Sequence, residues 1–381
     1  MGLDQREKLM LYKEIVEKIS VGVEKKLKQK EYLKEGLFEV VDQGQSLVGG
    51  FSNDSSLVVK CDLPVIVFGD HTKCVKFIDF PFIAGADGVK VLRAKECVDA
   101  KFLYYYTLLL TKKMIDKGYA RHYQFLEKME VEISSIDEQR RIVNKIEELF
   151  SELDSAVETL KKTKEQLAVY RQSVLKSAFE KCEESKKMGD VAIMIDPHPS
   201  HRTPPEFEKG IPYIGVGDID YKEKSIKMDE ARKVNPSIYN EHIERYTIHA
   251  GDFIMGKIGT IGKPYRLPLP QNYVLSANVI LIQPNTEIIN PEYLFWQFSS
   301  PLVVEQLMEG KNETSQPAFG IQKARLLNIK MCDYKKQNEI VQNLRLKMSV
   351  CDNIEKTVND ALIQADAMRQ SILKKAFEGD L

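Results

Sequence analysis

The sequence lacks an excess of charge of either sign. Its 381 residues include 55 Lys and Arg and 56 Asp and Glu, which gives a formal net charge of −1. A domain that binds nucleic acid through its overall charge usually carries a clear excess of basic residues. Any contact with DNA is therefore expected to come from local basic patches or from a companion subunit.

Cysteine and histidine are scarce, and their spacing does not suggest a metal site. His71 and Cys74 lie three residues apart, as do His198 and His201, but neither pair has a second pair that would complete a zinc site. There is no CxxC pair and no regular disulfide framework among the six cysteines, at positions 61, 74, 97, 182, 332 and 351. We therefore expect a reduced, cytoplasmic protein that binds no metal.

Long hydrophobic runs are also missing. The longest, Phe102–Leu110, is too short to span a bilayer, and the N-terminus has no apolar core of the signal-peptide type. These features predict a soluble protein without a membrane partner. A hydrophobic content of 43% is still ample for the cores of two or three domains.

What the chain does contain is an internal duplication. The segment Arg171–Glu180 (RQSVLKSAFE) recurs 198 residues later as Arg369–Glu378 (RQSILKKAFE). The match extends without a gap back to Gln139 and Gln337. Two unrelated amphipathic helices would rarely share ten consecutive positions of this kind, so the two segments are predicted to be repeats.

Apolar residues in both repeats recur at alternating steps of four and three, a pattern typical of long helices that pair in a coiled coil. Lys347 and several alanines weaken the second seam, so neither helix is expected to be stable alone. The predicted seam comprises Ile142, Ile146, Leu149, Leu153, Leu160, Leu167 and Val174 in the first copy, and Ile340, Leu344, Ile354, Val358, Met368 and Ile372 in the second.

The remaining sequence predicts two globular units of similar plan, each built from short strands, glycine-rich turns and a core helix. Pro291–Leu307 is expected to be one helix, and Leu57–Val59 one of the strands. The fold class is therefore α+β, with a twisted, mostly antiparallel sheet in each unit. The expected domains are residues 1–136, the first helical region 137–182, a second globular domain 183–336 and the second helical region 337–381.

A helix from residue 139 to 179 would be about 60 Å long. If the second helix folds back on the first, the pair is antiparallel with an approximate two-fold axis, and the globular units lie at opposite ends. Such a pair suits two DNA half-sites about one helical turn apart. A spacer between two unrelated binding domains remains an alternative at this point.

A glycine-rich stretch, Gly256–Lys263, suggests contact with phosphates. It is not a Walker A loop, because Lys257 and Pro264 stand where that loop needs Gly and Ser or Thr. No acidic residue occurs from Phe253 to Thr286, so Lys257, Lys263 and Arg266 are expected to be exposed cations beside a phosphate backbone or groove. A tight hairpin with solvated lysines is the alternative. The counterpart in the first unit is Phe68–Lys76, followed by Gly85–Gly88.

No stretch of the sequence indicates an active site. There is no Asn-Pro-Pro-aromatic motif of an amino-methyltransferase and no nuclease carboxylate cluster, and Gly215-x-Gly217 lacks the third glycine of a dinucleotide fingerprint. The chain is therefore expected to be neither an enzyme nor a cofactor-binding protein.

These features together resemble the DNA-specificity subunits of Type I restriction–modification systems, over nearly the whole chain. The resemblance rests on Glu138–Val143 and Gln337–Val341 at the helix starts and on the paired RQS(V/I)LK(S/K)AFE ends. It is supported by Ile211–Ile214, Gly251–Ile254 and Gly259–Lys263. Val41–Gln45, Pro64–Thr72 and Gly85–Gly88 resemble one common class of recognition domain, whereas the stretch before Val41 matches less well.

The resemblance implies a non-catalytic subunit whose two target-recognition domains each read one half of an asymmetric bipartite DNA target. It implies double-stranded DNA, two modification subunits carrying S-adenosylmethionine, and restriction subunits using ATP and Mg as partners. The candidate DNA-binding residues are Gly69, His71, Thr72, Lys73, Lys76, Arg121 and His122 in the first domain, and Lys257, Gly259, Thr260, Lys263, Arg266, Asn278 and Lys323 in the second.

Two alternatives stay open. One is the specificity subunit of a related system whose partner fuses methylation and cleavage. The other is a coiled-coil adaptor that pairs proteins.

Overall fold

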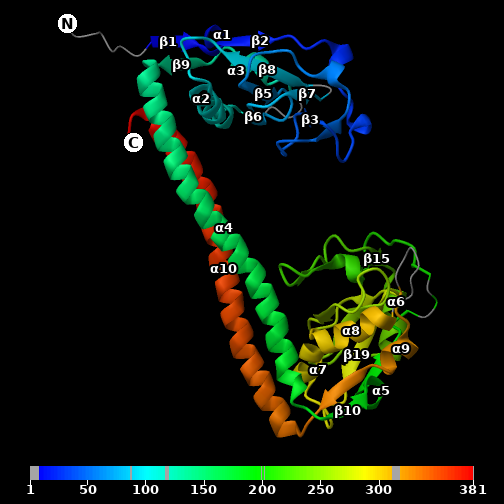
Figure 1. Ribbon diagram of the computed structural model, residues 1–381. Helices are drawn as coiled ribbons and strands as arrows, with labels where there is room; N and C mark the ends of the chain where they lie inside the picture. Colours follow the sequence, from blue (N-terminus) through cyan, green and yellow to red (C-terminus); the bar gives the residue numbers. More distant parts are fainter. Residues whose placement is uncertain are drawn as a thin grey trace. The chain divides into compact units, whose positions relative to one another are not determined.

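The computed structural model describes residues 8–85, 88–115, 120–198, 200, 202–310 and 318–380. The chain divides into two compact units: unit 1 is Met1–Leu160 with Asn359–Leu381, and unit 2 is Lys161–Val358. Each unit mixes strands and helices and contains a part of both long helices (Figure 1). The predicted α+β class is confirmed. Ala86, Asp87 and His201, which belong to motifs noted above, lie outside the described residues.

The described part of unit 1 contains three sheets and a core helix, α2. In chain order its elements are β1 (Lys8–Leu11), α1 (Tyr12–Ile15), β2 (Val16–Ile19), β3 (Phe38–Val41), β4 (Gly50–Ser52), β5 (Val65–Gly69), β6 (Val75–Ile78), β7 (Phe82–Ala84), β8 (Val89–Ala94), α2 (Ala100–Lys113), α3 (Tyr123–Leu126), β9 (Glu130–Ile133) and the start of α4 (Ile136–Glu180).

Unit 2 repeats this order with additions. Its elements are β10 (Glu184–Lys187), α5 (Met188–Val191), β11 (Ala192–Ile195), β12 (Ile211–Ile214), β13 (Ile219–Asp220), β14 (Ser225–Ile226), β15 (Lys233–Val234), α6 (Pro236–Arg245), β16 (Phe253–Gly256), β17 (Pro264–Arg266), β18 (Val274–Leu275), β19 (Val279–Pro284), α7 (Pro291–Phe298), α8 (Pro301–Gly310), α9 (Ile321–Arg325), β20 (Asn328–Met331) and the start of α10 (Tyr334–Glu378).

The sheets of the two units correspond strand by strand. A four-stranded antiparallel sheet has the order β2-β8-β5-β6 in unit 1 and β11-β19-β16-β17 in unit 2. A three-stranded sheet, β4-β3-β7 or β15-β12-β18, contains one parallel pair in each unit. The pairs β1·β9 and β10·β20 complete the match. The duplication therefore includes the globular parts as well as the helices.

The central strand of each unit is buried on both faces, which is why it reads as a continuous apolar run. In β5, Ile66 and Phe68 face one hydrophobic cluster while Val65 and Val67 face another. In β16, Phe253 and Ile254 divide in the same way between two clusters. One of these clusters in each unit includes the core helix, α2 or α7, so the sheet and that helix share a core.

Two predicted elements are wrong in detail. The helix expected over Pro291–Leu307 is interrupted: α7 ends at Phe298 and α8 begins at Pro301, which has no backbone N–H to continue the first helix. Leu57–Val59 is not a strand, because Ser55–Leu57 forms a 3-10 turn capped by Asp54.

The long helices α4 and α10 have 45 residues each and run antiparallel within both units. In unit 1, Arg369 of α10 pairs with Asp154 of α4. In unit 2, Arg171 of α4 pairs with Asp352 (2.7 Å) and Glu355 (2.9 Å) of α10. Arg171 and Asp154 lie 198 residues before Arg369 and Asp352, so the two ion pairs are related by the duplication.

The predicted seam is right at one heptad position and one residue off at the other. Ile146, Leu167, Val174, Leu344 and Val358 are buried as expected. At the alternate position, however, Phe150 and Met348 are buried, rather than Leu149 and Lys347. Ile354 and Met368 are 40% and 55% exposed, so they are not seam residues.

This error has a physical cause. Next to the exposed Ile354 and Met368, the partly buried positions are Glu355 and Arg369, which form ion pairs with the other helix. A search for apolar residues passes over a seam position filled by a charged side chain, although its aliphatic stem can still be buried there.

A buried glutamine is the fourth residue of each long helix, Gln139 in α4 and Gln337 in α10. The backbone N–H of Asp99 donates to Gln139 Oε1 (2.8 Å), and Gln139 Nε2 donates to the carbonyl oxygens of Cys97 (3.1 Å) and Ser134 (2.8 Å). Gln337 repeats this pattern: its Oε1 accepts from the Asn290 N–H (2.8 Å), and its Nε2 donates to Cys332 O (2.9 Å) and Ile288 O (3.4 Å). Asp99 and Asn290 are the N-cap residues of α2 and α7.

Each long helix ends on an aromatic contact with a core helix. Phe179 of α4 packs edge-on against Tyr293 of α7, with ring centroids 5.2 Å apart. Phe377 of α10 packs in the same manner against Phe102 (5.1 Å) and Tyr106 (4.5 Å) of α2. The start of one long helix and the end of the other are therefore fixed to the same core helix in each unit.

Gln139→Leu and Gln337→Leu are each expected to lower the free energy of unfolding by about 1–3 kcal/mol, because each leaves buried backbone groups without a partner. Gln172→Leu, at an exposed and equally duplicated position, serves as the control and should stay within about 0.5 kcal/mol. Urea unfolding followed by circular dichroism measures the difference. Equal effects of buried and exposed substitutions would contradict the anchoring role of the two glutamines.

Candidate nucleic-acid interface

In unit 1, four connections converge at one edge of the sheets, and we call them loop cluster 1: residues 42–44, 70–74, 88 and 120–122. The Thr72 hydroxyl donates to Gln43 O (2.7 Å), and the Cys74 thiol donates to Gly44 O (3.2 Å). The His71 ring lies 3.2 Å from Ala120 O. The turn between β5 and β6 is thereby held against the connections that follow β3 and α2.

Asp70, at the centre of loop cluster 1, is buried and joins three connections. Its backbone N–H donates to Gly88 O (2.6 Å), and its carbonyl oxygen accepts from the His122 N–H (2.8 Å). Its carboxylate accepts from the Tyr123 N–H (2.8 Å) and lies 3.3 Å from Lys90 Nζ. The loops are thus positioned by a buried charge with both hydrogen-bond and ionic partners, an arrangement that offsets the cost of burial.

The predicted residues of unit 1 divide between loop surface and loop support. Thr72 and Arg121 are exposed, and His71 and Lys73 are partly exposed. Lys76 and His122 are buried: Lys76 Nζ lies 3.5 Å from Asp42, and His122 Nδ1 lies 3.0 Å from Asp70 O. The sequence predicted that Lys76 and His122 contact DNA at the surface. Both are buried, so they lie beneath the loops and hold them in place. Gly69 is needed for packing, because a Cβ there would lie 2.3 Å from the Thr72 hydroxyl.

In unit 2, the equivalent connections form loop cluster 2, defined as residues 215–218, 257–263 and 276–278. The stretch 257–263 joins β16 to β17, as the β5–β6 turn does in unit 1. The predicted correspondence between these two loops is therefore confirmed by the strand order.

Two glycines permit the shape of the 257–263 loop. Gly259 and Gly262 have φ values of +77° and +73°, a region that side chains disfavour. Around Gly259 there is open space, whereas a Cβ on Gly262 would lie 2.4 Å from Leu307. Gly259 and Thr260 are exposed at the tip, so a ligand can approach the backbone closely there.

Lys257 is not the exposed cation that the sequence predicted. It is buried, and its Nζ lies 2.8 Å from a carboxylate oxygen of Asp196. The hydropathy pattern could not reveal this, because Asp196 lies 61 residues earlier in the chain and the acid-free stretch contains no partner for the lysine. The ammonium group supports the loop from below.

The other predicted cations of unit 2 lie in different settings. Lys263 is exposed, with its Nζ 4.0 Å from the centre of the Tyr221 ring. Arg266 stacks on Phe295 (3.9 Å) and pairs with Glu292, so part of its charge is already matched. Burial, followed by the nearby Arg345, lowers the pKa of Arg266. Lys323 donates to Gly310 O (2.9 Å) from α9, which does not belong to loop cluster 2.

A hollow of about 410 Å³ opens where the parallel strands β12 and β18 end. Asn278 lies in its wall, and its Oδ1 accepts from the Val216 N–H (3.3 Å) and from the Ser276 hydroxyl. Because a backbone N–H must meet an oxygen, this fixes the orientation of the amide and leaves Nδ2 as the donating group. Sequence reasoning missed most of the lining, which includes Thr203, Tyr213, Asp218, Arg232 and Ser276. The Gly215-x-Gly217 pattern was the one local signal.

A chain of buried hydrogen bonds holds the segment before the hollow. His198 Nε2 lies 2.9 Å from Arg202 O, His198 Nδ1 lies 3.1 Å from His242 Nε2, and His242 Nδ1 lies 2.9 Å from the Tyr246 hydroxyl. Arg202 O can only accept, so His198 Nε2 carries a proton. With both rings neutral, His198 Nδ1 then accepts from His242 Nε2–H, and His242 Nδ1 accepts from the Tyr246 hydroxyl. Burial, followed by the neighbouring His198 and Arg245, lowers the pKa of His242 to about 4.

Unit 2 should lose stability as the pH falls from about 6.5 to 4. The pKa of His242 is about 4 in the folded chain and 6.5 ordinarily, so the unfolded chain binds the proton more strongly in this window. The expected loss is up to roughly 3 kcal/mol. Urea midpoints measured across this range should fall less steeply for His242→Gln, while the exposed His249→Gln keeps the wild-type profile. An unchanged profile for His242→Gln would remove this histidine as the cause.

Comparison with known proteins gives a consistent result. Residues 12–168 match the family model of the Type I restriction modification DNA specificity domain. The EcoBI specificity subunit of Escherichia coli is 28% identical over 176 residues, which cover 46% of this chain and 36% of that protein. The EcoKI specificity subunit of Escherichia coli strain K12 is 25% identical over 272 residues, covering 66% of this chain and 57% of that protein. The alignments thus span less than two thirds of either relative.

Two solved structures share the fold over the whole chain. One comes from a study of complex assembly and conformational transition of the type I R-M system, with a TM-score of 0.70, 16% identity and complete coverage of both chains. The other is the HsdS subunit from Thermoanaerobacter tengcongensis, with a TM-score of 0.54 and 16% identity, covering 100% of this chain and 99% of that one. At 16% sequence identity, the structural similarity establishes the fold of this chain but not which ligands it binds. Every helix in the described part of the chain is either too short or too polar to span a bilayer.

Proposed function

The chain belongs, through residues 12–168, to the Type I restriction modification DNA specificity family, and from this premise we propose that it reads a bipartite DNA target without chemistry of its own. In this proposal loop cluster 1 reads one half-site and loop cluster 2 reads the other. The stretch of DNA between them is not read.

The observation that carries this proposal is the matching topology of the two units. Both end the third strand of the same four-stranded sheet on a glycine, Gly69 or Gly256, and place a turn between the third and fourth strands, beside the end of the parallel pair. A duplicated scaffold with different loop residues is suited to reading two different half-sites, because base edges are recognised by side chains and the scaffold only positions them. The near-neutral net charge fits a subunit that shares DNA binding with partners.

The long helices offer a place for those partners. In unit 2 a groove of about 570 Å³ lies between α4 and α10 and is lined by apolar side chains such as Tyr170, Val350 and Ile354. Leu346 and Val350 are 72% and 57% exposed. Exposed apolar surface of this kind is typical of a protein-binding site. We assign this face to the modification subunits, which would supply S-adenosylmethionine and extrude the target adenine from the stack. Restriction subunits using ATP and Mg would join the same complex.

Methylome sequencing of a host that expresses this chain with its modification subunit tests the function. We expect adenine methylation in two short specified parts separated by a gap of fixed length. Asn278→Asp keeps the carbonyl oxygen of the side chain but removes its donating nitrogen, so it should change the motif in one part only. A single continuous motif, or a change in both parts, would contradict the assignment of one unit to each half-site. Adaptor function without DNA recognition predicts no motif at all.

Lys263→Ala should weaken DNA binding by the complex and reduce the slope of log K against log salt by about one. Lys257→Met should leave that slope unchanged and instead lower stability by roughly 1–3 kcal/mol, because it removes the partner of Asp196. Lys186→Ala, at an exposed position on β10, is the control for general loss of charge. A salt series of binding measurements checks this, and equal slopes for all variants would remove the 257–263 loop from the interface.

A further inference from the structure

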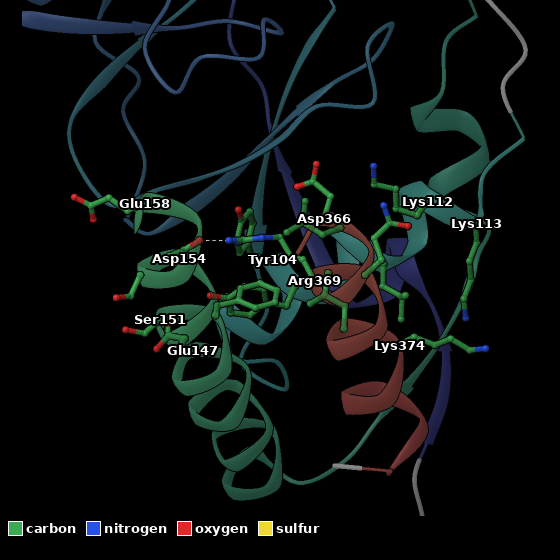
Figure 2. A pocket seen from close by; sticks show the side chains of 17 residues that line it. Tyr104, Lys112, Lys113, Glu147, Ser151, Asp154, Glu158, Asp366, Arg369 and Lys374 are labelled. Carbon is green, nitrogen blue, oxygen red and sulfur yellow. Dashed lines mark hydrogen bonds and ion pairs between the residues drawn. The ribbon is translucent and has the colours of Figure 1, made fainter. Parts of the chain in front are cut away.

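Unit 1 contains a large cleft that the proposed reading of DNA does not use. It has a volume of about 1070 Å³ and lies between α2, the first part of α4 and the last part of α10. Its floor is apolar and aromatic and includes Tyr104, Leu109 and Phe150. Figure 2 shows acidic side chains of α4 on one side and the lysines of α2 on the other. The acidic residues are Glu147, Asp154, Glu158 and, from α10, Asp366.

The duplication shows what occupies the equivalent position in unit 2. Asp154 corresponds to Asp352, and both carboxylate oxygens of Asp352 have cationic partners. Arg171 holds Oδ1 at 2.7 Å, and Lys224 holds Oδ2 at 2.9 Å. Burial raises the pKa of Asp352, but the hydrogen bonds from Lys224 and Arg171 outweigh it, so the pKa is lowered overall.

Lys224 reaches Asp352 from a hairpin that is particular to unit 2. It lies at the tip between β13 and β14, with a φ of +52°. This hairpin is part of residues 215–232, which connect β12 to β15. The corresponding connection in unit 1, residues 42–49, leads from β3 directly into β4 and includes no hairpin. Arg369 pairs with Oδ1 of Asp154, as Arg171 does with Asp352, and the Asp154 side chain is 61% exposed.

The surrounding charges also differ between the repeats. Glu147, Glu158 and Asp366 in unit 1 stand where unit 2 has Arg345, Lys356 and Ala168. The helix walls of the cleft therefore carry four carboxylates, three on α4 and Asp366 on α10, at positions where the repeat carries one carboxylate and two cations. Glu147 is already paired with Lys101 (2.6 Å). The surface that unit 2 covers with Lys224 has no such hairpin in unit 1. Its α4 and α10 positions carry more carboxylates than those of unit 2, and Lys112, Lys113 and Lys374 line the same cleft.

We infer that this cleft is the docking site for a lysine- or arginine-tipped loop of the modification subunit, taking the place that the Lys224 hairpin occupies in unit 2. This inference rests on the proposed function, since it names a contact of the proposed partner. The incoming cation pairs with Oδ2 of Asp154 and with Glu158 or Asp366. Its aliphatic stem packs on Tyr104 and Leu108, which are partly exposed in the lining of the cleft and suit a long basic side chain.

The test uses the full chain and the purified modification subunit. The triple variant Asp154→Asn, Glu158→Gln and Asp366→Asn removes the charge and keeps side-chain size. We expect its affinity for the modification subunit to fall about tenfold or more, with a weaker dependence on salt. Asp352→Asn, at the repeat position whose cations come from the same chain, is the matched control and should stay within about twofold.

A second variant keeps the carboxylates and blocks the cleft instead. Replacing residues 45–49 with residues 219–232 supplies unit 1 with the hairpin of unit 2 and keeps residues 42–44 of loop cluster 1. The graft is expected to weaken binding of the modification subunit, and Lys224→Ala within the graft is expected to restore it in part. If the triple variant and the graft both bind as the wild type does, the inference is wrong.

The outcomes separate this inference from the proposed function. If the wild-type chain forms a DNA-reading complex and the cleft variants form it equally well, only the docking site is overturned. If the wild-type chain binds neither the modification subunit nor DNA with it, the proposed function fails as well. Self-association of the wild type that the triple variant abolishes, seen by sedimentation, would assign the cleft to a second copy and overturn the inference.

Discussion

Two buried glutamines, Gln139 and Gln337, are the constraint on which the architecture depends. Each accepts a hydrogen bond from the backbone N–H of the N-cap residue of a core helix and donates one to a carbonyl oxygen just before a long helix. The core helix and the long helix of each unit therefore share one hydrogen-bond network. Phe377 and Phe179 then end the opposite helices on the same core helices. Because each unit fixes the beginning of one long helix and the end of the other, the two helices can pair only in antiparallel orientation within it.

The charged residues in the seam fix the register of the two helices, in addition to their antiparallel orientation. Exposed ion pairs contribute little stability, but a charged residue in a helical seam discriminates strongly against pairings that would leave it without a partner. Arg171 with Asp352 and Arg369 with Asp154 are copies of one interaction, so a single register satisfies both. The apolar residues between them could tolerate a shift by one heptad, whereas the arginines could not.

The sequence was sufficient for features that repeat or that have a period. The duplication, the heptads and the alternating strands predicted the two units, the antiparallel helices and the correspondence of the β5–β6 and β16–β17 turns. It was insufficient where the partner is distant in the chain. Lys257 looked exposed because Asp196 is not nearby in sequence, and Glu355 and Arg369 were passed over because charge hides a seam position. Arg232 and Ser276 enter the hollow only through the fold.

Under the proposed function, the duplicated scaffold also accounts for two halves of one chain that present different loop surfaces. Strand register makes Gly69 equivalent to Gly256. Gly69 ends β5 and pairs with Val89, the first residue of β8, while Gly256 ends β16 and pairs with Val279, the first residue of β19. The following residues are Asp70 and Lys257, which have opposite charges, and each is buried with a partner of the other sign, Lys90 or Asp196. A single charge reversal beneath the loop would leave an unpaired buried ion, so both members of the pair must change together. Lys90 lies on β8 and Asp196 follows β11, so the partner of the buried charge comes from a different strand in each unit, while the strand order of the sheet is the same. Divergence confined to these supporting residues and loops therefore gives two different loop surfaces on one duplicated scaffold.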